Sequence, residues 1–188
     1  MFNFTRQYSV KDGLITDELA SHIVENLPAR YASAETWKRI YSLQHDGASL
    51  QTMYLACEKE KARSGHPKGA CILAVRDTDG DVFGVFIPDY LIPAPHYFGS
   101  EETFLWKYFP PKKYVHYPFV GNSNFVAYCT KSFLAFGGGN GRYSLWLDGS
   151  LEYAYSSRTP AFENNPLSYR GCPDQRIQIV DIELWVLE

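Results

Sequence analysis

The apolar positions of residues 133–155 form three short runs separated by glycine-rich segments. Short apolar runs with turn residues between them predict a meander of antiparallel strands. Asn140-Gly141 and Asp148-Gly149 accept positive φ at little steric cost, so we expect each dipeptide to form a two-residue hairpin turn. In the strand between them, alternation predicts one face formed by Tyr143, Leu145 and Leu147 and an opposite face formed by Arg142, Ser144 and Trp146.

Two earlier segments show the spacing of amphipathic helices. In the first, Leu19, Ile23 and Leu27 recur at every fourth position after Thr16, a residue type that caps helices, and Pro28 ends the pattern. The second segment follows Ser49, which is also a capping residue type. Its apolar stripe is formed by Leu50, Met53, Tyr54 and Cys57. We expect the charged tail of this helix to be solvated: Lys59, Glu60, Lys61 and Arg63.

Most of the remaining apolar runs have the length and alternation of strands. In residues 177–186 the alternation slips by one position, which predicts a β-bulge near Ile179-Val180. About nine or ten strands with two helices predict an α+β fold, in which two packed antiparallel β-sheets form a β-sandwich with two or more flanking α-helices. We expect residues 1–15 to be a lead-in and residues 16–188 to be a single domain.

Composition and charge narrow the function classes. The chain has 188 residues, enough for a sizeable core, and 16% aromatic residues, which favours sheet over helix. A net charge of -3 does not indicate the basic surface that nucleic-acid-binding proteins usually have, so no nucleic-acid partner is expected. The chain shows no signal peptide and no apolar run of membrane-spanning length, so we expect a soluble protein without direct membrane insertion. Lys112-Lys113 is too small a basic loop for stable membrane attachment, although it leaves a lipid-surface module open as an alternative.

The cysteines and acidic loops do not encode a recognisable metal or cofactor site. The four cysteines, Cys57, Cys71, Cys129 and Cys172, are scattered without a CxxC motif, which predicts reduced and mostly buried thiols. The acidic turn at residues 76–81 lacks the glycine and glutamate positions of a calcium loop. The glycine run at residues 137–141 precedes a strand and not a helix, so it is interpreted as a turn and not as a phosphate loop. We therefore expect no metal and no cofactor.

Three places are candidates for a special role. Strand parity puts Glu102 on an aromatic face, where a carboxylate is expected to be a buried structural acceptor or, as the functional alternative, a general acid/base or a partner contact. At the turn before the second helix, Asp46 is expected to cap helix N–H groups while His45 packs. Tyr97 and Phe98 lie in a proline-rich excursion with Tyr90, Leu91 and Ile92, which is a candidate for an exposed apolar patch.

Six segments, taken in order, resemble a TLDc domain, most closely its oxidation resistance protein branch. They are residues 37–54, 76–86, 97–106, 136–151, 162–168 and 181–188. The resemblance covers residues 16–188. The family commonly has Gly-x-Gly-Glu where this chain has Gly99-Ser100-Glu101-Glu102, so Glu101 is expected to be strained if that position needs a positive φ.

The resemblance implies a β-sandwich flanked by helices and a cytoplasmic role in resistance to oxidative stress. It also implies a partner, the peripheral sector of the vacuolar-type proton ATPase, whose assembly the domain would control, with disassembly or inhibition favoured. Recruitment to the vacuolar or lysosomal membrane would follow through that partner, with mitochondrial or nuclear pools as further options. The alternative function is a small antioxidant or hydrolytic enzyme that uses Glu102 or a cysteine; no GxSxG elbow is present to support a Ser-His-Asp set.

Overall fold

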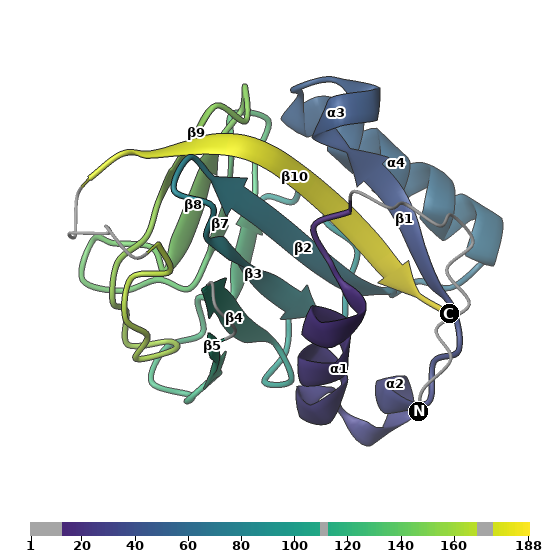
Figure 1. Cartoon of the computed structure of the whole chain (residues 1–188), viewed down its shortest axis with the longest axis horizontal. Coiled ribbons are helices and arrows are strands. Elements are labelled where there is room, and N and C mark those ends of the chain that lie inside the picture. The colour runs from purple at the N-terminus through teal and green to yellow at the C-terminus, as the bar shows by residue number, and fades with distance from the viewer. Residues whose placement is uncertain (1–12, 110–112, 169–174) are drawn as a thin grey trace.

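The computed structural model describes residues 13–109, 113–168 and 175–188. These residues form ten strands and four helices (Figure 1). The helices are α1 (Asp17–Asn26), α2 (Ala29–Ala32), α3 (Leu43–Asp46) and α4 (Leu50–Ser64). The strands are β1 (Trp37–Ser42), β2 (Ala70–Asp77), β3 (Val82–Ile87), β4 (Phe104–Phe109), β5 (Lys113–Pro118), β6 (Ala127–Cys129), β7 (Phe133–Phe136), β8 (Leu145–Asp148), β9 (Tyr153–Tyr155) and β10 (Ile177–Leu187).

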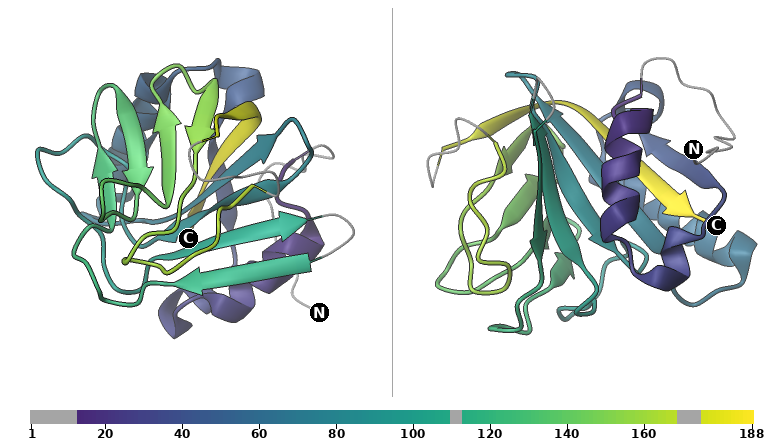
Figure 2. Two further views of the ribbon diagram at one scale, coloured as in Figure 1. Left: turned by 90° about the vertical axis from the view of Figure 1, so that its left-hand side faces the viewer. Right: turned by 60° about the horizontal axis from the view of Figure 1, so that its bottom comes forward.

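The described strands pair antiparallel in one path, β5-β4-β3-β2-β10-β9-β8-β7-β6. Strand β1 lies off this path and pairs with the edge of β10 opposite to β2. Strand β10 joins the two halves of this sheet, because residues 177 and 178 pair with β9 while its later residues pair with β2 and β1. Its register shifts between Ile179 and Asp181, which confirms the predicted bulge. The antiparallel α+β fold is therefore confirmed, and its two layers are halves of one sheet linked by β10 (Figure 2).

Two apolar clusters explain this arrangement. The larger one takes buried side chains from both halves of the sheet, for example Leu73 of β2 and Leu147 of β8, together with the inner side of α4. The smaller one lies where α1 covers the opposite face of β2, β3 and β4, with Ile23 of α1 and Trp106 of β4 both fully buried. Leu14 and Ile15, at the end of the expected lead-in, are buried in this second cluster. Residues 1–12 lie outside the described residues.

Both predicted helix caps are confirmed. The Thr16 hydroxyl accepts a hydrogen bond from the N–H of Leu19 at 3.2 Å, and the Ser49 hydroxyl accepts one from the N–H of Thr52 at 3.3 Å. Each bond satisfies one of the N–H groups that the first turn of a helix leaves without an intrahelical partner. Helix α4 ends at Ser64, and Gly65 caps it with a φ of 70°, the left-handed conformation that favours glycine.

The two predicted hairpin turns have different outcomes. Asn140 and Gly141 have φ of 57° and 70° and connect the bridged pair Gly139 and Arg142, so this two-residue turn is confirmed. The prediction for Asp148-Gly149 is wrong, because Asp148 ends β8 and residues 149–152 form a longer loop to β9. The Asp148 carboxylate accepts the N–H groups of Glu152 and Tyr153, both at 2.9 Å, and so organises this loop through its side chain.

The predicted faces of the central meander strand are correct only within β8. Leu145 and Leu147 are fully buried, whereas Trp146 between them is partly exposed on the opposite face. The strand begins at Leu145, so alternation does not extend back to Tyr143, whose ring is partly exposed and contacts the ring of Phe133. Ser144 is buried and hydrogen-bonds the hydroxyl of Thr159 at 2.6 Å. The prediction that Tyr143 shares the buried face of Leu145 and Leu147 is therefore wrong, because Tyr143 lies in an irregular segment before β8.

Candidate functional site

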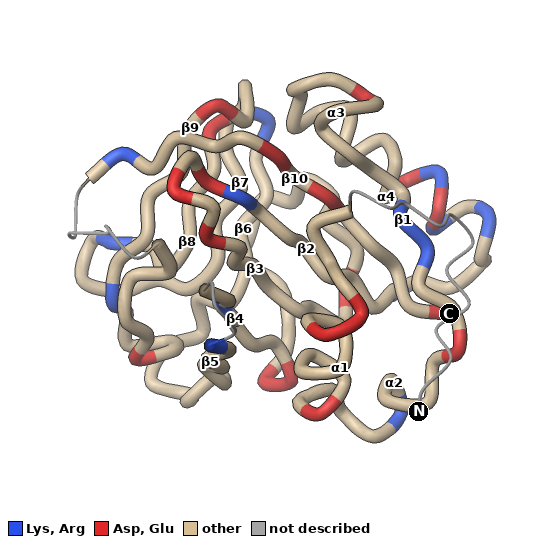
Figure 3. Tube along the Cα trace, in the orientation of Figure 1, with Lys and Arg blue, Asp and Glu red and all other residues tan. Residues whose placement is uncertain are grey.

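The α4–β1 groove is an open hollow of about 670 Å³ between helix α4 and strand β1. Residues 38–42 of β1 form one wall, His45 and Asp46 of α3 close one end, and the other wall is formed by Thr52, Leu55, Ala56, Lys59, Glu60 and Arg63 of α4. Figure 3 shows basic residues beside acidic ones where α4 lies next to β1. The groove therefore combines charged side chains of both signs with apolar ones such as Ile40 and Leu55.

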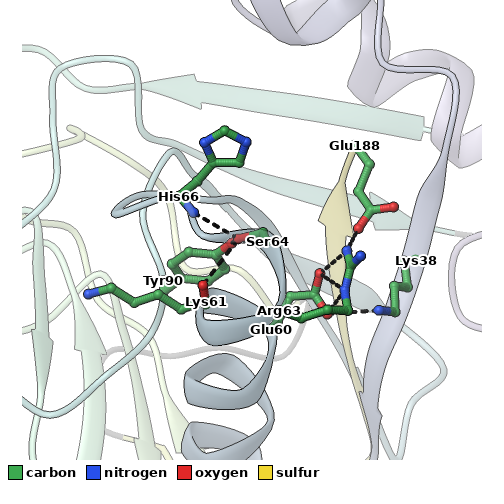
Figure 4. A network of polar contacts seen from close by, with 8 residues as sticks. All are labelled: Lys38, Glu60, Lys61, Arg63, Ser64, His66, Tyr90 and Glu188. Carbon is green, nitrogen blue, oxygen red and sulfur yellow. Dashed lines mark hydrogen bonds and ion pairs between the residues drawn. The ribbon is translucent and has the colours of Figure 1, made fainter.

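Glu60 is the electrostatic centre of this groove (Figure 4). Its side chain is only 5% exposed and accepts hydrogen bonds from Lys38 Nζ at 2.8 Å and Arg63 Nε at 3.0 Å. Arg63 also pairs with Glu188, so α4, β1 and the end of the chain share one ionic network. The prediction that Glu60 is solvated is thus wrong, because the turn of α4 that contains Glu60 faces β1.

The pKa of Glu60 makes the network sensitive to acid. Burial by itself raises this pKa, but the hydrogen bonds from Lys38 and Arg63 outweigh burial and hold the pKa below its ordinary value of 4.5. A carboxyl whose pKa is lowered by folding contributes stability that is present above pH 4.5 and is lost as the pH falls through the folded-state pKa. The wild-type protein should therefore lose this contribution below about pH 4.5, whereas a variant without the carboxyl has none to lose.

We expect Glu60→Gln to lower the free energy of unfolding by about 1–3 kcal/mol at pH 7. The difference between wild type and Glu60→Gln should shrink as the pH is lowered from 5 to 3, because the wild-type carboxyl becomes protonated. Urea unfolding at a series of pH values measures this difference. A gap that stays constant over that range would show that Glu60 is not ionised and paired in the folded protein.

His45 and Asp46 lie together at the α3 end of the groove, but not in the roles that the sequence predicted. Asp46 Oδ2 accepts the N–H of Ser42 at 2.8 Å and so closes the single turn of α3, while Ser49 caps α4. His45 is exposed and does not pack into the core. Asp46 does not cap α4 as predicted, because residues 43–46 form a helical turn of their own, α3, before α4 begins.

Glu102 is not the buried carboxylate that strand parity predicted. Strand β4 begins two residues later, at Phe104, and the Glu102 side chain is 32% exposed. Its carboxylate accepts hydrogen bonds from both terminal nitrogens of Arg30, a residue of α2. The expected strain at Glu101 is also absent, since the residue with positive φ in this segment is Gly99, at 105°.

The expected apolar patch of the proline-rich excursion is largely wrong. Tyr90 and Leu91 are buried, at 4% and 0% exposure, and Ile92 is partly buried against the larger core cluster. Phe98 pairs with Ala127 of β6 through two main-chain hydrogen bonds of 2.9 Å, so this segment extends the edge of the sheet. Tyr97 is partly exposed and stacks on Tyr128 at a centroid distance of 4.8 Å.

The described cysteines have the properties of core residues. Cys57, Cys71 and Cys129 are free thiols with no exposed surface, as predicted, and Cys172 lies outside the described residues. Hydrogen bonding with Cys57 and burial raise the pKa of the Cys71 thiol, and burial raises that of Cys129. Thiols with raised pKa are poor nucleophiles. These three thiols belong to the larger core cluster, whereas Glu102 pairs with Arg30, so they do not form a catalytic set with it.

Within residues 13–109, 113–168 and 175–188, no group of three or more metal-ligating side chains occurs. In the same residues, no helix combines the length and the apolar content that crossing a membrane requires. Of the two lysines considered for lipid contact, Lys113 is exposed at the start of β5 and Lys112 lies outside the described residues.

The sequence analysis also missed the buried ionic site at Glu183. This side chain is 2% exposed, and its carboxylate accepts hydrogen bonds from Arg39 Nη1 at 2.9 Å, Trp185 Nε1 at 3.0 Å and the N–H of Leu14 at 3.1 Å. It joins β1, β10 and the residues before α1. The available signal was a glutamate inside the apolar run of residues 182–187, which predicts a buried acid with partners.

Comparison with known proteins places the chain in a family. The TLDc domain model matches residues 8–188. Oxidation resistance protein 1 of Eremothecium gossypii is 36% identical over 184 residues, covering 94% of this chain and 74% of that protein. Oxidation resistance protein 1 of Yarrowia lipolytica is 33% identical over 182 residues, covering 95% of this chain and 75% of that protein.

A relative of the same name from Podospora anserina is 29% identical over 226 aligned positions. That alignment includes all of this chain but 63% of the Podospora protein, so the chain spans less than two thirds of that relative. The family model and these identities agree with one another over almost the whole chain. The chain therefore belongs to the TLDc domain family.

Proposed function

We propose that this TLDc domain confers resistance to oxidative stress as a non-enzymatic regulatory domain. It acts by binding the peripheral sector of the vacuolar-type proton ATPase and favouring disassembly or inhibition of that enzyme. The role in oxidative-stress resistance is supported by the family match over residues 8–188 and by relatives that are named for oxidation resistance. The resemblance to TLDc regulators supplies the partner. In this proposal the domain works in the cytoplasm and reaches the vacuolar or lysosomal membrane through that partner.

The outward side of α4 is the surface best suited to such docking. Leu55 is 47% exposed, the largest exposed fraction among the large apolar residues that the structure describes. It lines the α4–β1 groove on one side and a second hollow of about 230 Å³ on the other, where Ile92, Pro93 and Lys131 lie opposite the helix. We call Leu55, between these two hollows, the α4 ridge. An exposed apolar side chain with charged residues around it, here Glu58 and Lys59, can act as the anchor of an interface.

A matched pair of variants tests this surface. We expect Leu55→Glu to weaken binding of the purified peripheral sector by at least about tenfold, because a carboxylate would have to be desolvated at the centre of the interface. Glutamate is a good helix former, so α4 is retained. Val120→Glu changes a similar residue, 41% exposed in the loop after β5, and should leave binding unchanged. Fluorescence anisotropy of the labelled full chain measures both affinities.

Three outcomes count against the proposal. If the wild-type protein does not bind the peripheral sector, the partner is wrong. If Leu55→Glu and wild type bind equally, docking uses another surface. If Val120→Glu weakens binding as much as Leu55→Glu, the effect is one of added negative charge and not of the α4 ridge. Circular dichroism of each variant establishes that the fold is intact before affinities are compared.

A further inference from the structure

Strand β5 lies at one end of the sheet and leaves an edge open. It is the first strand of the pairing path, and in the described part of the chain no strand lies beyond it (Figure 1). Its six residues pair with β4 without a register shift, so the strand is regular along its whole length. An open edge of this kind presents main-chain N–H and C=O groups to which another strand can bond.

The outward main-chain groups of β5 belong to Tyr114 and His116. The N–H of Phe119, directly after the strand, donates to the carbonyl of Thr103, directly before β4, at 3.3 Å. In an antiparallel ladder the main-chain groups of successive residues point alternately to the two edges of the strand. The odd-numbered residues of β5 therefore bond β4, whereas Tyr114 and His116 direct their N–H and C=O groups to the open edge.

The side chains of these two residues are held by the fold. The Tyr114 ring stacks on the ring of His22 in α1 at a centroid distance of 5.2 Å. The His116 ring lies edge-on to the ring of Phe104 in β4 at 4.8 Å. Their main-chain groups are therefore fixed before a second strand arrives, which lowers the entropy cost of pairing.

The residues at the two ends of β5 restrict pairing to its centre. Pro118 also follows the outward alternation but has no N–H to donate, so a register that needs a donor there is disfavoured. Lys113 is exposed at the start of the strand, and like charges directly opposite each other on paired strands are destabilising. Antiparallel pairing centred on Val115 uses only the main-chain groups of Tyr114 and His116 and satisfies both limits.

We propose that two copies of this chain associate through the open edges of their β5 strands, antiparallel, with a two-fold axis at Val115. Tyr114 then exchanges both of its outward hydrogen bonds with His116 of the second copy, and His116 does the same with Tyr114 of the second copy. A two-fold interface brings the same patch of each copy together. The outward groups of β5 meet this condition because they lie symmetrically on either side of Val115.

The side-chain pattern of β5 favours a second copy over an unrelated strand. Symmetry places Lys113 opposite Tyr117 of the second copy, so the two lysines lie at opposite ends of the pair. Val115 is partly exposed and belongs to neither apolar cluster, so its contact with Val115 of the second copy covers apolar surface that the fold leaves open. Cross-strand side-chain contacts of this kind stabilise paired strands.

The dimer leaves the α4 ridge of each copy available, because β5 and α4 lie well apart in Figure 1. The inference therefore concerns a second surface and does not depend on the proposed ATPase partner. A dimer would present two α4 ridges to that partner, which increases avidity where a single site binds weakly.

A matched pair of variants tests the main-chain contact. In sedimentation velocity of the full chain at rising concentration, the wild type should pass from monomer to dimer; a single strand pair buries little surface, so we expect a weak dimer. His116→Pro removes the outward N–H without removing a bond to β4. It should weaken the dimer at least about tenfold, because one hydrogen bond is lost on each side of the axis. His116→Ala removes the same side chain but keeps that N–H, and should weaken the dimer at most about threefold.

Introduced cysteines test the register. Val115→Cys places the introduced thiol opposite its copy across the two-fold axis, close enough for a disulfide. Oxidised glutathione supplies the exchange, in which the two protein thiols are oxidised to the disulfide and oxidised glutathione is reduced to two glutathione thiols. Lys113→Cys, at the exposed end of the strand, is the control and should cross-link at least about tenfold more slowly, because its thiol lies opposite Tyr117. The wild-type chain treated in the same way accounts for the native cysteines.

Several results would overturn the inference. A chain that stays monomeric at millimolar concentration would exclude the dimer. Equal weakening by His116→Pro and His116→Ala would show that the edge of β5 is not used, and equal cross-linking of Val115→Cys and Lys113→Cys would show that the register is wrong. A monomeric chain whose Tyr114 and His116 amides become protected from hydrogen exchange only with the purified peripheral sector would assign the edge to that partner. If His116→Pro does not fold by circular dichroism, the cysteine pair decides the question.

Discussion

Replacing Gly84 by alanine is expected to abolish the native fold or to lower its free energy of unfolding by more than about 4 kcal/mol. Gly84 lies in the middle of β3, paired with Ala74 of β2 and Trp106 of β4. A Cβ atom at this position would lie 1.7 Å from the carbonyl oxygen of Leu73 and 2.8 Å from the Trp106 ring. Both neighbours are fixed, one as main chain and the other as a fully buried side chain.

Gly80→Ala is the matched control for this prediction. Gly80 lies in the turn of the same hairpin with a φ of 88°, and an added Cβ would meet nothing within 4 Å. Its substitution should cost only the penalty of a left-handed backbone, about 1–2 kcal/mol. Urea unfolding followed by tryptophan fluorescence compares the two variants. If Gly84→Ala were as stable as Gly80→Ala, the close approach of β2, β3 and β4 would be wrong.

The second large effect is expected at Glu183. Removing its carboxylate with Glu183→Ala leaves Arg39 without its partner at a site where the Arg39 side chain is 13% exposed. The indole N–H of Trp185 also loses its acceptor. Breaking a buried ion pair on one side typically costs about 3–5 kcal/mol, because the remaining charge stays desolvated. We therefore expect a loss of that size in the free energy of unfolding.

Glu102→Ala is the control for Glu183→Ala, because it also removes a carboxylate paired with an arginine, but at an exposed site. Glu102 also pairs with an arginine, but the two side chains are 32% and 57% exposed, so water screens the pair. Its loss should cost at most about 1 kcal/mol. Denaturant titrations of the two variants at pH 7 make the comparison. Equal costs for Glu183→Ala and Glu102→Ala would contradict the assignment of Glu183 as the buried ionic centre.

Local signals predicted much of the fold because their causes lie within a few residues. Thr16 and Ser49 cap helices through hydrogen bonds to N–H groups three positions later, and the parity slip at Ile179-Val180 is visible in the alternation itself. The Asn140-Gly141 turn follows from backbone preferences alone. Asp148 misled the prediction, because its side chain bonds N–H groups four and five residues away and lengthens the loop.

The candidate sites were harder to predict because their partners are distant in sequence. Glu183 bonds Arg39, which is 144 positions earlier, and Glu60 bonds Lys38 across the gap between α4 and β1. A helical tail such as residues 59–63 looks solvated until the strand beside it is known. Glu102 was misplaced by assigning it to β4, which begins at Phe104. In each case tertiary contact decided the burial of a charged residue.

The proposed function requires that this domain control assembly of the vacuolar-type proton ATPase. The most direct test measures ATP hydrolysis and the assembly state of the purified enzyme, with and without a stoichiometric excess of the wild-type chain. If the domain acts as proposed, the enzyme loses its coupled ATPase activity and releases its peripheral sector. An enzyme that keeps its full activity and remains assembled in the presence of the domain would show that the proposed function is wrong.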